Sequence, residues 1–491
     1  MKVCSTNLIG EGSYSKVYKN SSKTVIKKYK NLDDGCPADM IKEIAVLQKI
    51  TSPYIISVLN ILEDSIILPL YEDDLSIYFK KGNKIEIPQF MFTIFNAVYH
   101  LHSSGICHRD IKPSNILVRD SKSGVLIDFG FSKTLDLDRR FGRKTPNIIT
   151  NWYRPPEVID ENRDYSFEVD VWSLGCILAE LYQEAHLFNY KTDIQILKAQ
   201  CYLMGTPQNY FQNIKVPEYK GVFKENFALY GDEVCELLSG MLSINHMERW
   251  DITQCLNSKY FGRHQYKNVK NNYIEYLEKY HFQIGQIPES ILKMRQILVL
   301  WMLECCTSYN LSDTTYFRSV IILDEFISNN KTIAITKDNF QLVGMASLWI
   351  GSKVETQYNI SLENLIYISD DSFSKQQLID MEKAVLKEIN YNTFNPVLIN
   401  YISMFKEEFS LDKTQIYKMN KYLHLCSIFV ENYKYPFFKI AGICARLSCG
   451  KVLVAEDRYT EEDEELLICQ EQILKCVHKT FELVEEKFCK K

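Results

Sequence analysis

The residues best suited to chemistry lie between positions 108 and 130. Residues 108–115 read His-Arg-Asp-Ile-Lys-Pro-Ser-Asn, and Asp128-Phe129-Gly130 follows. Asp110 has the chemistry to orient a hydroxyl nucleophile and accept its proton, and Lys112 to neutralise a phosphate during transfer. Asn115 and Asp128 offer the hard oxygen ligands that Mg²⁺ prefers. This ordered set predicts phosphoryl transfer rather than coincidental loop polarity.

Two weaker signals lie upstream. Residues 10–15 read Gly-Glu-Gly-Ser-Tyr-Ser after a β-like start, and glycines let backbone N–H groups approach phosphate oxygens closely. Lys27 ends the strand-like run Thr24-Val25-Ile26. Taken alone, the first signal is more typical of an ordinary hairpin turn, and the second of a solvated lysine.

Glu43 is more discriminating, because it lies on or beside the apolar stripe of a helix expected near residues 37–50. Burying a carboxylate without a partner costs on the order of several kcal/mol, because the charge loses its hydration. Lys27 is the partner that we expect. A solvated position at the edge of the stripe is the alternative.

The composition limits the classes of protein to consider. The chain has 491 residues, of which 46% are hydrophobic and 24% charged, and a net charge of -5. Such a chain has enough apolar surface to fold, and its charge argues against a broad nucleic-acid-binding face. No apolar run reaches the ~18 residues that span a bilayer, and the first ten residues do not resemble a signal peptide. The 15 cysteines form no Cys-x-x-Cys pair, so we expect reduced thiols and a nuclear or cytoplasmic location, without membrane or nucleic-acid partners.

The elements that must position these residues change along the chain. Short β-type runs surround one helix in residues 1–80, and helices alternate with Gly- and Pro-containing loops from about 88 to 262. Long helical patterns follow beyond about 270. The sequence therefore predicts an α+β unit followed by an all-α unit, with a linker near residues 262–271.

Residues 1–262 resemble a eukaryotic protein kinase, and most of all a cyclin-dependent kinase. Residues 37–43 (Pro-Ala-Asp-Met-Ile-Lys-Glu) are similar to the PSTAIRE helix of that family, and residues 152–157 (Trp-Tyr-Arg-Pro-Pro-Glu) to its WYRAPE element. The resemblance implies a bilobal fold, a Lys27–Glu43 ion pair, Asp110 as catalytic base assisted by Lys112, and ATP and Mg²⁺ as cofactors. Asn115 and Asp128 would hold the metal. The residues implied in ATP binding are Ile9, Gly10, Glu11, Gly12, Val17, Lys27, Leu68, Leu70, Asn115 and Asp128.

The same resemblance implies further structural roles. Leu68 occupies the gatekeeper position, and the residues from Pro69 to Tyr71 would form the adenine-binding hinge. Glu157 would pair with Arg249, and Asp170 would support the catalytic loop. One departure is Ser15 at the position of the third loop glycine, which we expect to stiffen the backbone near the phosphates.

A regulatory segment is implied between Asp128 and Glu157. Thr145 matches the activating threonine of the family, and the residues implied to hold its phosphate are Lys42, Arg109 and Lys133. Lysine cannot form the bidentate fork of arginine, so we expect a weaker clamp. Pro146 follows Thr145, which suggests phosphorylation in trans by this enzyme itself, and an unmodified threonine is the alternative. Ser13 and Tyr14 match the family's inhibitory phosphorylation positions.

Residues from about 270 to 485 resemble a cyclin, most closely the mitotic A/B type. We expect a linker and amino-terminal helix over 263–285, the first cyclin repeat over 286–395 and a more divergent second repeat over 396–485. The landmarks of the resemblance are Met294-Arg295-Gln296-Ile297-Leu298, Leu342-Val343-Gly344, Ser352-Lys353-Val354-Glu355 and Ile368-Ser369-Asp370-Asp371.

Charged residues on apolar stripes are usually edge residues, but a lysine and a glutamate together in this half suggest an ion pair or an interface. Lys353 and Glu382 continue such stripes, and the resemblance implies that they contact the kinase helix that carries Ile41 and Glu43. It also implies a groove that recruits Arg-x-Leu motifs. The residues of this predicted groove are Met294, Ile297, Leu298, Trp301, Glu304, Phe340 and Gln341. Periodicity alone favours a purely internal stripe for the same helix.

Together these features predict a cyclin-dependent kinase fused to its own cyclin. The expected reaction is ATP-Mg²⁺-dependent phosphorylation of Ser/Thr-Pro sites in cell-cycle proteins, with Ile148 and Ile149 accepting the proline. The cyclin would act in cis, or in trans within a swapped dimer. A transcription-type kinase acting on RNA polymerase tails is an alternative, because Pro155 also occurs in that class. A scaffold without strong catalysis and an adaptor for another kinase are further alternatives.

Overall fold

The computed structural model describes residues 8–134, 151–161, 166–262, 264–285, 287, 289–356, 359–451 and 466–476. These residues divide into two compact units. The sheet-bearing unit contains the described residues up to Leu32 and those from Asp39 to Tyr273. The helical unit contains Asp33–Ala38 and the described residues from Ile274 onward. Among the described helices, none is both long and apolar enough to cross a membrane.

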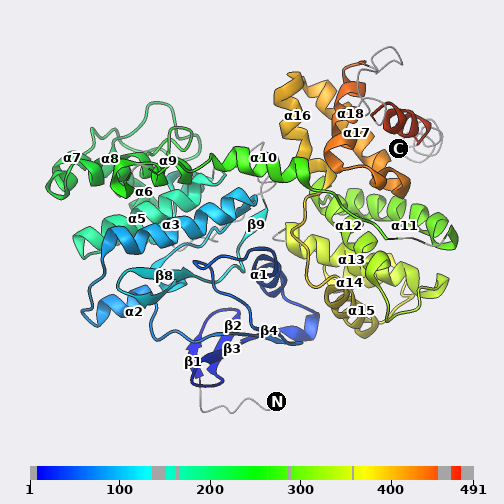
Figure 1. Cartoon of the computed structure of the whole chain (residues 1–491), viewed down its shortest axis with the longest axis horizontal. Coiled ribbons are helices and arrows are strands. Elements are labelled where there is room, and N and C mark those ends of the chain that lie inside the picture. Colours follow the sequence, from blue (N-terminus) through cyan, green and yellow to red (C-terminus); the bar gives the residue numbers. More distant parts are fainter. Residues whose placement is uncertain are drawn as a thin grey trace. The chain divides into compact units, whose positions relative to one another are not determined.

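The sheet-bearing unit begins with a five-stranded antiparallel sheet in the order β1-β2-β3-β5-β4 (Figure 1). The strands are β1 (Leu8–Glu11), β2 (Ser15–Lys19), β3 (Thr24–Tyr29), β4 (Asn60–Ile61) and β5 (Ser65–Pro69). In β3 the β-branched Val25 and Ile26 are buried, which suits a central strand. Helix α1 (Ala38–Lys49) follows β3 in the chain, and its residues 40–47 are all buried.

The rest of this unit is mainly helical. Its longest helices are α3 (Ile87–Ser103) and α5 (Glu168–Gln183), and α5 is buried on nearly every side, as expected for a core helix. Two small antiparallel sheets lie in the chain between these helices: β6 (Ile106–Cys107) pairs with β9 (Lys133–Thr134), and β7 (Ile116–Asp120) pairs with β8 (Ser123–Leu126). The other helices are α2 (Leu75–Lys80), α4 (Pro156–Ile159), α6 (Asp193–Met204), α7 (Phe223–Phe227), α8 (Asp232–Met241) and α9 (Ile252–Leu256).

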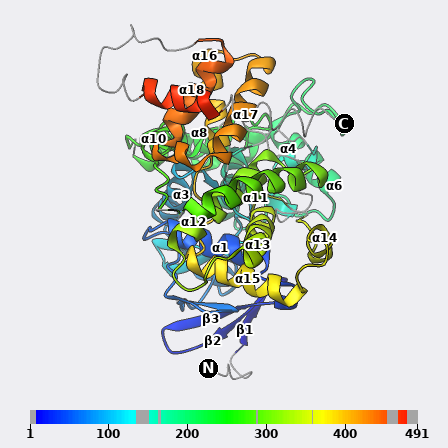
Figure 2. The same ribbon diagram turned by 90° about the vertical axis from the view of Figure 1, so that its right-hand side faces the viewer.

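The helical unit is built around α13 (Lys337–Glu355), which packs against α11, α12 and α15 (Figure 2). Its other helices are α11 (Glu289–Ser308), α12 (Asp313–Asn329), α14 (Leu362–Ile368), α15 (Lys375–Glu388), α16 (Ile402–Phe409), α17 (Lys413–Ile428) and α18 (Phe437–Ser448). Residues 466–476 are also helical. The boundary between the units falls inside α10 (Val269–Lys279).

A buried arginine ties the two parts of the helical unit together. Arg295 on α11 forms a bidentate ion pair with Asp324 on α12, at 2.5 and 2.6 Å. It also donates to the carbonyl oxygens of Ser427 and Ile428 at the end of α17 (3.0 and 2.8 Å). Four acceptor contacts satisfy a guanidinium that is fully removed from water.

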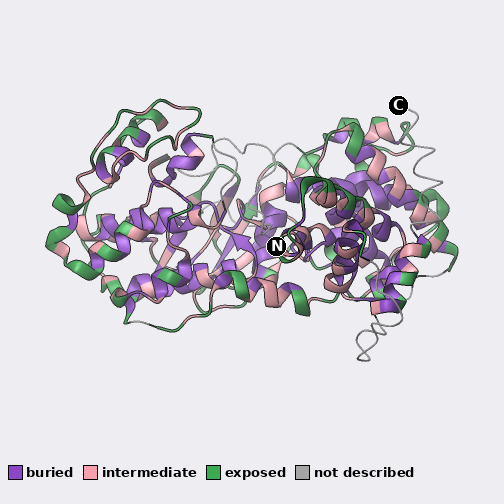
Figure 3. Cartoon of the chain, turned by 90° about the horizontal axis from the view of Figure 1, so that it is seen from above, coloured by how far each residue is buried: buried purple, intermediate pink, exposed green. Residues whose placement is uncertain are grey.

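In both units the buried residues follow the inner faces of the helices (Figure 3). The predicted order, an α+β unit with a small sheet followed by an all-α unit, is confirmed.

Candidate active site

Lys27 and Glu43 meet between β3 and α1. The Lys27 Nζ lies 2.8 Å from Glu43 Oε1 and 2.7 Å from Oε2, and Glu43 is 2% exposed. The predicted ion pair is therefore present, and the alternative of a solvated Glu43 is excluded. Burial alone would lower the pKa of Lys27, but Glu43 and Asp128 raise it, so the ammonium stays charged.

Tyr29 supports this pair and was not predicted from the sequence. Its hydroxyl donates to Glu43 Oε2 at 2.7 Å, and both groups are buried. Residues two apart in a strand share a face, so Tyr29 lies on the same side of β3 as Lys27. The alternation of side chains along the strand could therefore have predicted Tyr29 on the same face as Lys27.

The same lysine reaches the residue predicted to hold metal. Lys27 Nζ lies 3.0 Å from Asp128 Oδ1. Burial pushes the pKa of Asp128 upward, but Lys27 opposes this strongly enough to hold the pKa below its usual value. Asp128 is therefore an ionised oxygen donor. It has a positive φ of 66°, in the sparsely populated left-handed region.

Asp110, Lys112 and Asn115 form a second cluster in the loop after β6. Lys112 Nζ donates to Asp110 Oδ2 at 2.7 Å. Asn115 Nδ2 donates to the backbone oxygen and to Oδ2 of Asp110, at 2.8 and 3.0 Å. Because the amide nitrogen is engaged there, Asn115 Oδ1 is left as the acceptor available to a cation. Burial raises the pKa of Asp110, and Lys112 partly opposes this.

Asp170 on α5 holds the backbone of this loop, as predicted. Its carboxylate accepts the N–H groups of His108 and Arg109, both at 2.8 Å, and lies 2.9 Å from His102 Nε2. His108 Nε2 lies 3.0 Å from the carbonyl oxygen of Ile127, so it carries the proton. Its Nδ1 then accepts the N–H of Asp110 at 3.2 Å. The backbone is thus held on both sides of Asp110, the predicted base.

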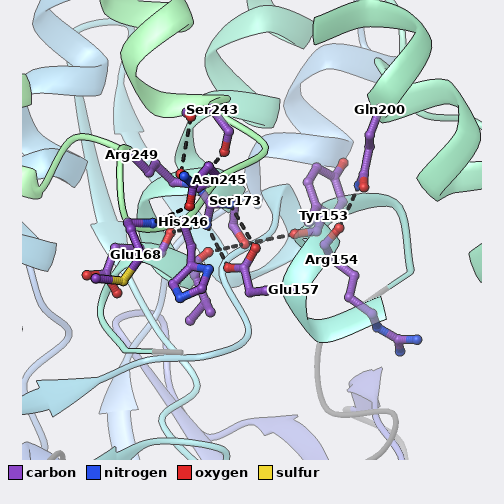
Figure 4. Close-up of polar contacts among 12 residues, drawn as sticks. Tyr153, Arg154, Glu157, Glu168, Ser173, Gln200, Ser243, Asn245, His246 and Arg249 are labelled. Carbon is purple, nitrogen blue, oxygen red and sulfur yellow. Dashed lines mark hydrogen bonds and ion pairs between the residues drawn. The ribbon is translucent and has the colours of Figure 1, made fainter. Parts of the chain in front are cut away.

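Glu157 and Arg249 form the predicted structural pair (Figure 4). The contact is bidentate, at 2.7 and 2.8 Å, and neither side chain is exposed to solvent. Arg249 also donates to the backbone oxygens of Ser243 and Glu168, at 3.1 and 3.0 Å. Its guanidinium lies 4.9 Å from the Trp172 ring centre. A charge pair with this many partners offsets its desolvation cost.

Comparison with known proteins identifies this arrangement. Residues 4–261 match the protein kinase domain family, and residues 264–394 match the cyclin amino-terminal domain family. The chain belongs to the protein kinases. It is a cyclin-dependent Ser/Thr kinase that carries a kinase domain and a cyclin domain in one polypeptide.

Three relatives illustrate the similarity. Cyclin-dependent kinase 7 of Xenopus laevis is 30% identical over 52% of this chain and 80% of its own. Cell division control protein 2 homolog 2 of Trypanosoma brucei brucei is 31% identical, covering 53% and 83%. The probable CTD kinase subunit alpha homolog of Encephalitozoon cuniculi is 29% identical, covering 52% and 82%. Among solved structures, a chain of the yeast RNA Pol II CTD kinase CTDK-1 complex has a TM-score of 0.47 at 25% identity, covering 53% and 94%.

The glycine loop of the kinase forms the hairpin between β1 and β2. The N–H of Gly12 donates to the carbonyl oxygen of Ser15 (2.9 Å). Ser15 pairs with Tyr29 in regular strand register, and its φ is not positive. Serine therefore costs no backbone strain there, and the stiffening expected from it stays a prediction. An added Cβ at Gly10 or Gly12 would meet nothing closer than 3.9 Å, so packing within the chain does not demand these glycines.

Charged and aromatic groups at this hairpin carry two further predictions. Lys30, which was not predicted, donates to Glu11 Oε1 and to the Gly12 carbonyl oxygen, at 2.8 and 2.7 Å. Ser13 and Tyr14 are exposed at the tip, as a phosphorylation site requires, and the Tyr14 ring lies edge-on to Phe131. Ile9 is exposed and Val17 half-buried on the flanking strands.

The hinge follows β5. Leu68 is 6% exposed, which suits a gatekeeper that closes the back of the site. The N–H of Leu70 donates to the Lys23 carbonyl oxygen at 2.9 Å, and Pro69 has no N–H. Leu70 therefore has no free N–H for adenine. The next amide is that of Tyr71, which makes no hydrogen bond within the described part of the chain.

The structure describes the three residues predicted to hold the phosphate of Thr145, but not Thr145 itself. Lys133 on β9 pairs with Cys107 on β6, and Arg109 Nε donates to the Phe131 carbonyl oxygen (2.8 Å). Lys42 is buried on α1. Thr145, like Ile148 and Ile149, lies outside the described residues.

In the helical unit, Lys353 and Glu382 form the expected pair, with Nζ 2.5 Å from Oε1. Lys353 donates to the carbonyl oxygen of Cys36 (2.9 Å), and the N–H of Cys36 donates to Glu382 Oε2 (2.8 Å). The contact was expected on the helix that carries Glu43. The structure shows it on the main chain of Cys36, before α1 begins, because a lysine and a glutamate together satisfy one peptide acceptor and one donor. Ile41 is fully buried on α1.

The residues of the predicted recruitment groove differ in how far they are buried. Ile297 is 71% exposed, whereas Leu298 and Phe340 are 6% and 4% exposed. Leu298 packs where a Cβ on Gly344 would lie, so it belongs to the helix core. The internal alternative therefore holds for Leu298 and Phe340. The other four residues, Met294, Trp301, Glu304 and Gln341, are half-buried and offer some surface.

Proposed function

We propose that this kinase phosphorylates serine or threonine before proline, in the manner of the transcription-type enzymes that act on polymerase-tail repeats. The carrying observation is that Lys27, Glu43 and Asp128 are joined by ion pairs, while Asp110, Lys112 and Asn115 form a second bonded cluster beside them. A chain that kept these groups only as a scaffold would have no need of them.

The side chains fit an ATP-Mg²⁺ complex by their donor chemistry. Asn115 Oδ1 and the Asp128 carboxylate are the hard oxygen donors that Mg²⁺ takes. When bound, ATP supplies the phosphoryl group and Mg²⁺ offsets its charge. Glu43 and Tyr29 hold Lys27 in place for the α- and β-phosphates.

The proton step belongs to Asp110. Its carboxylate accepts the proton of the substrate hydroxyl as the oxygen attacks, and Lys112 stabilises negative charge at the transferred group. Asp170 and His108 fix Asp110 through the backbone, so little reorganisation is needed at the moment of reaction.

The substrate class is inferred from the names of related proteins. One is a CTD kinase subunit homolog, and another is cyclin-dependent kinase 7. Cell-cycle substrates are the second candidate, favoured by the 31% identity to a cell division control protein 2 homolog and by the resemblance of the helical half to mitotic A/B-type cyclins. Arg-x-Leu recruitment and a nuclear or cytoplasmic location belong to this proposal.

The fused cyclin is proposed as the enzyme's own activator. Covalent linkage supplies an effective concentration of roughly millimolar when the geometry permits docking in cis. Residues 286–395 and 396–485 would be its two repeats. Thr145, Ser13 and Tyr14 are proposed phosphorylation sites. Light scattering combined with assays at increasing dilution separates the two arrangements: a dimer that loses activity on dilution contradicts docking in cis.

The decisive experiment compares the full chain with Asp128→Asn, using ATP-Mg²⁺ and two peptides. One peptide carries polymerase-tail repeats and the other Ser-Pro-x-Lys. We expect phosphorylation of the tail peptide with the higher kcat/KM, and a loss of roughly a thousandfold or more in the variant. Preference for Ser-Pro-x-Lys would move the assignment to the cell-cycle class. An inactive full chain would favour a scaffold.

A further inference from the structure

The segment between the last short helices of the kinase domain and the cyclin half was expected to be a linker, but it is fixed to the kinase domain. Residues 264–273 belong to the sheet-bearing unit. Residues 264–268 have no regular secondary structure, and the following five residues form the first part of α10. We call residues 264–273 the strap. No step of the proposed chemistry uses it.

Asn257, directly after α9, holds the main chain of the strap. Its Oδ1 accepts the N–H of Tyr266 at 2.7 Å, and its Nδ2 donates to the carbonyl oxygen of the same residue at 3.1 Å. One side-chain amide thus satisfies a main-chain donor and acceptor, as a neighbouring strand would. The Tyr266 hydroxyl donates to Asn96 Oδ1 on α3 (2.9 Å), and its ring lies edge-on to Tyr99 with centres 5.0 Å apart.

Helices α3 and α9 hold the strap at further points. The Tyr99 hydroxyl donates to the carbonyl oxygen of Lys267 (2.9 Å) and accepts from Asn272 Nδ2 (2.8 Å). Val269 is buried, and its N–H donates to Thr253 Oγ1 at 3.0 Å. Releasing the strap would break all of these bonds at once, because they lie within a few residues of one another. The segment is therefore not a slack linker.

The chain beyond the strap is held just as closely, within the helical unit. Leu277 is buried, and its carbonyl oxygen accepts the Tyr401 hydroxyl at 2.9 Å. Phe282 is buried among aromatic rings, and the N–H of Gly285 donates to Ser328 Oγ (3.1 Å). Between them, α10 runs without a break across the boundary of the two units. Among the described residues of this connection, no stretch is left as a free hinge.

We infer that the strap commits each cyclin half to the kinase domain of its own chain. Exchange of halves between two chains needs a hinge segment that can open. Here the strap would have to leave the kinase domain before a swapped pair could form. The inference rests on the proposed function, because it takes the fused cyclin to be the activator, and it decides between the two arrangements that this function allows.

Hydrogen exchange on the full-length chain tests the strap without an activity assay. We expect the amides of Val269 and Asn272 to exchange slowly, as in a fixed element. The double variant Asn257→Ala with Tyr99→Phe removes four hydrogen bonds of the strap but leaves both amides their own acceptors. Each bond is worth about two- to tenfold, so both amides should exchange at least roughly fifteenfold faster. Gln265→Ala is the matched control and should change nothing, because its side chain is exposed and makes no contact among the described residues.

Mixing two full chains, each expected to be inactive, tests the consequence. One carries Asp128→Asn and keeps its cyclin half intact, and the other carries Lys353→Met with Glu382→Leu and keeps its kinase domain intact. Only exchange of cyclin halves can restore activity, so the mixture with native straps should stay inactive. When both chains also carry the strap double variant, we expect recovery of about 1% at roughly 10 μM, the ratio of that concentration to a millimolar effective concentration.

Three results would overturn the inference. These are strap amides that exchange as fast as those of an unfolded segment, exchange that the double variant leaves unchanged, or equal activity of the two mixtures. A native chain without kinase activity would refute the proposed function instead, and hydrogen exchange would then decide on the strap alone.

Discussion

Among individual side chains, Tyr29 gives a sharp test of how Lys27 is held in place. Tyr29→Phe removes the hydroxyl that donates to buried Glu43 and leaves the ion pair otherwise intact. We expect a loss of about 1–2 kcal/mol in unfolding free energy and a rise in the KM for ATP of several-fold. Chemical denaturation and steady-state kinetics measure both. Tyr18→Phe is the control, because no hydrogen bond of its hydroxyl is found within the described residues, and equal effects of the two changes would argue against this role.

Lys112 gives a prediction on the pH dependence of the rate. Only the ionised form of Asp110 accepts a proton, and burial raises its pKa while Lys112 opposes the rise. The rate should therefore fall with decreasing pH at a higher pH than for an ordinary aspartate. Lys112→Met should move this acid limb of the kcat/KM profile to still higher pH, whereas Lys112→Arg, which keeps the charge, should leave it near its original place. An acid limb that stays put in Lys112→Met contradicts the assignment of Asp110 as base.

The sequence was enough to predict the site residues that belong to a recognisable motif. It was not enough to predict residues that matter only because folding places them beside the site. Lys27, Glu43, Asp110 and Asn115 could be read because their chemistry is specific. Tyr29 was available from strand alternation. The cavity beside Lys112 that Phe79 and Trp152 line could not be predicted, because these two residues are distant in the chain and only the folded structure brings them together.

Helix α12 carries a half-buried carboxylate whose ionisation should weaken the helical unit. Burial raises the pKa of Glu325 to about 7, against the opposing hydrogen bond from Asn392 (3.0 Å) and the charge of Arg318. The folded form therefore holds its proton more tightly than the unfolded chain. Its contribution to stability is full below the unfolded pKa near 4.5 and is lost as pH rises through about 7.

Glu325→Gln should remove this pH dependence. At pH 8 the variant should be more stable than the native chain, by at most about 3 kcal/mol from the size of the shift, while at pH 5 the two should be similar. Melting temperatures across pH 5–8 check this. Asn392→Ala, which removes the opposing hydrogen bond, should instead steepen the loss. A variant equally stabilised at both pH values would assign the effect to packing rather than to ionisation.

For the helical elements, the sequence predicted the helix itself but not which of its residues are buried. The spacing of Met294, Ile297 and Leu298 correctly indicated a helix, but it could not tell which residue faces solvent. Leu298 fills the space left by Gly344, a relation between α11 and α13 that no local pattern encodes.

For the whole molecule, the pair formed by Lys353 and Glu382 offers a test of self-activation. Removing one partner leaves a buried charge, so Lys353→Ala should cost about 3–5 kcal/mol. The double variant Lys353→Met with Glu382→Leu should recover much of that stability, because apolar residues of similar size replace the ion pair. In the double variant the main chain of Cys36 still lacks its hydrogen bonds to Lys353 and Glu382. The kcat/KM should therefore remain low if the cyclin half acts through this segment.

Differential scanning calorimetry and peptide assays on the same samples separate the two effects. Lys375→Met with Glu363→Leu, an exposed ion pair in the same unit, is the matched control and should change neither quantity. Recovery of full activity along with stability in the buried double variant would show that the contact serves folding alone.

The assignment of Asp33–Ala38 to the helical unit has a thermodynamic consequence. The chain enters and leaves that unit between β3 and α1, which carry Lys27 and Glu43, and returns to it within α10. Unfolding the cyclin half must therefore release the segment of chain that lies between Lys27 and Glu43. A nucleotide that binds only the intact site would then, by mass action, raise the melting temperature of the cyclin half as well, although none of its contacts lie there.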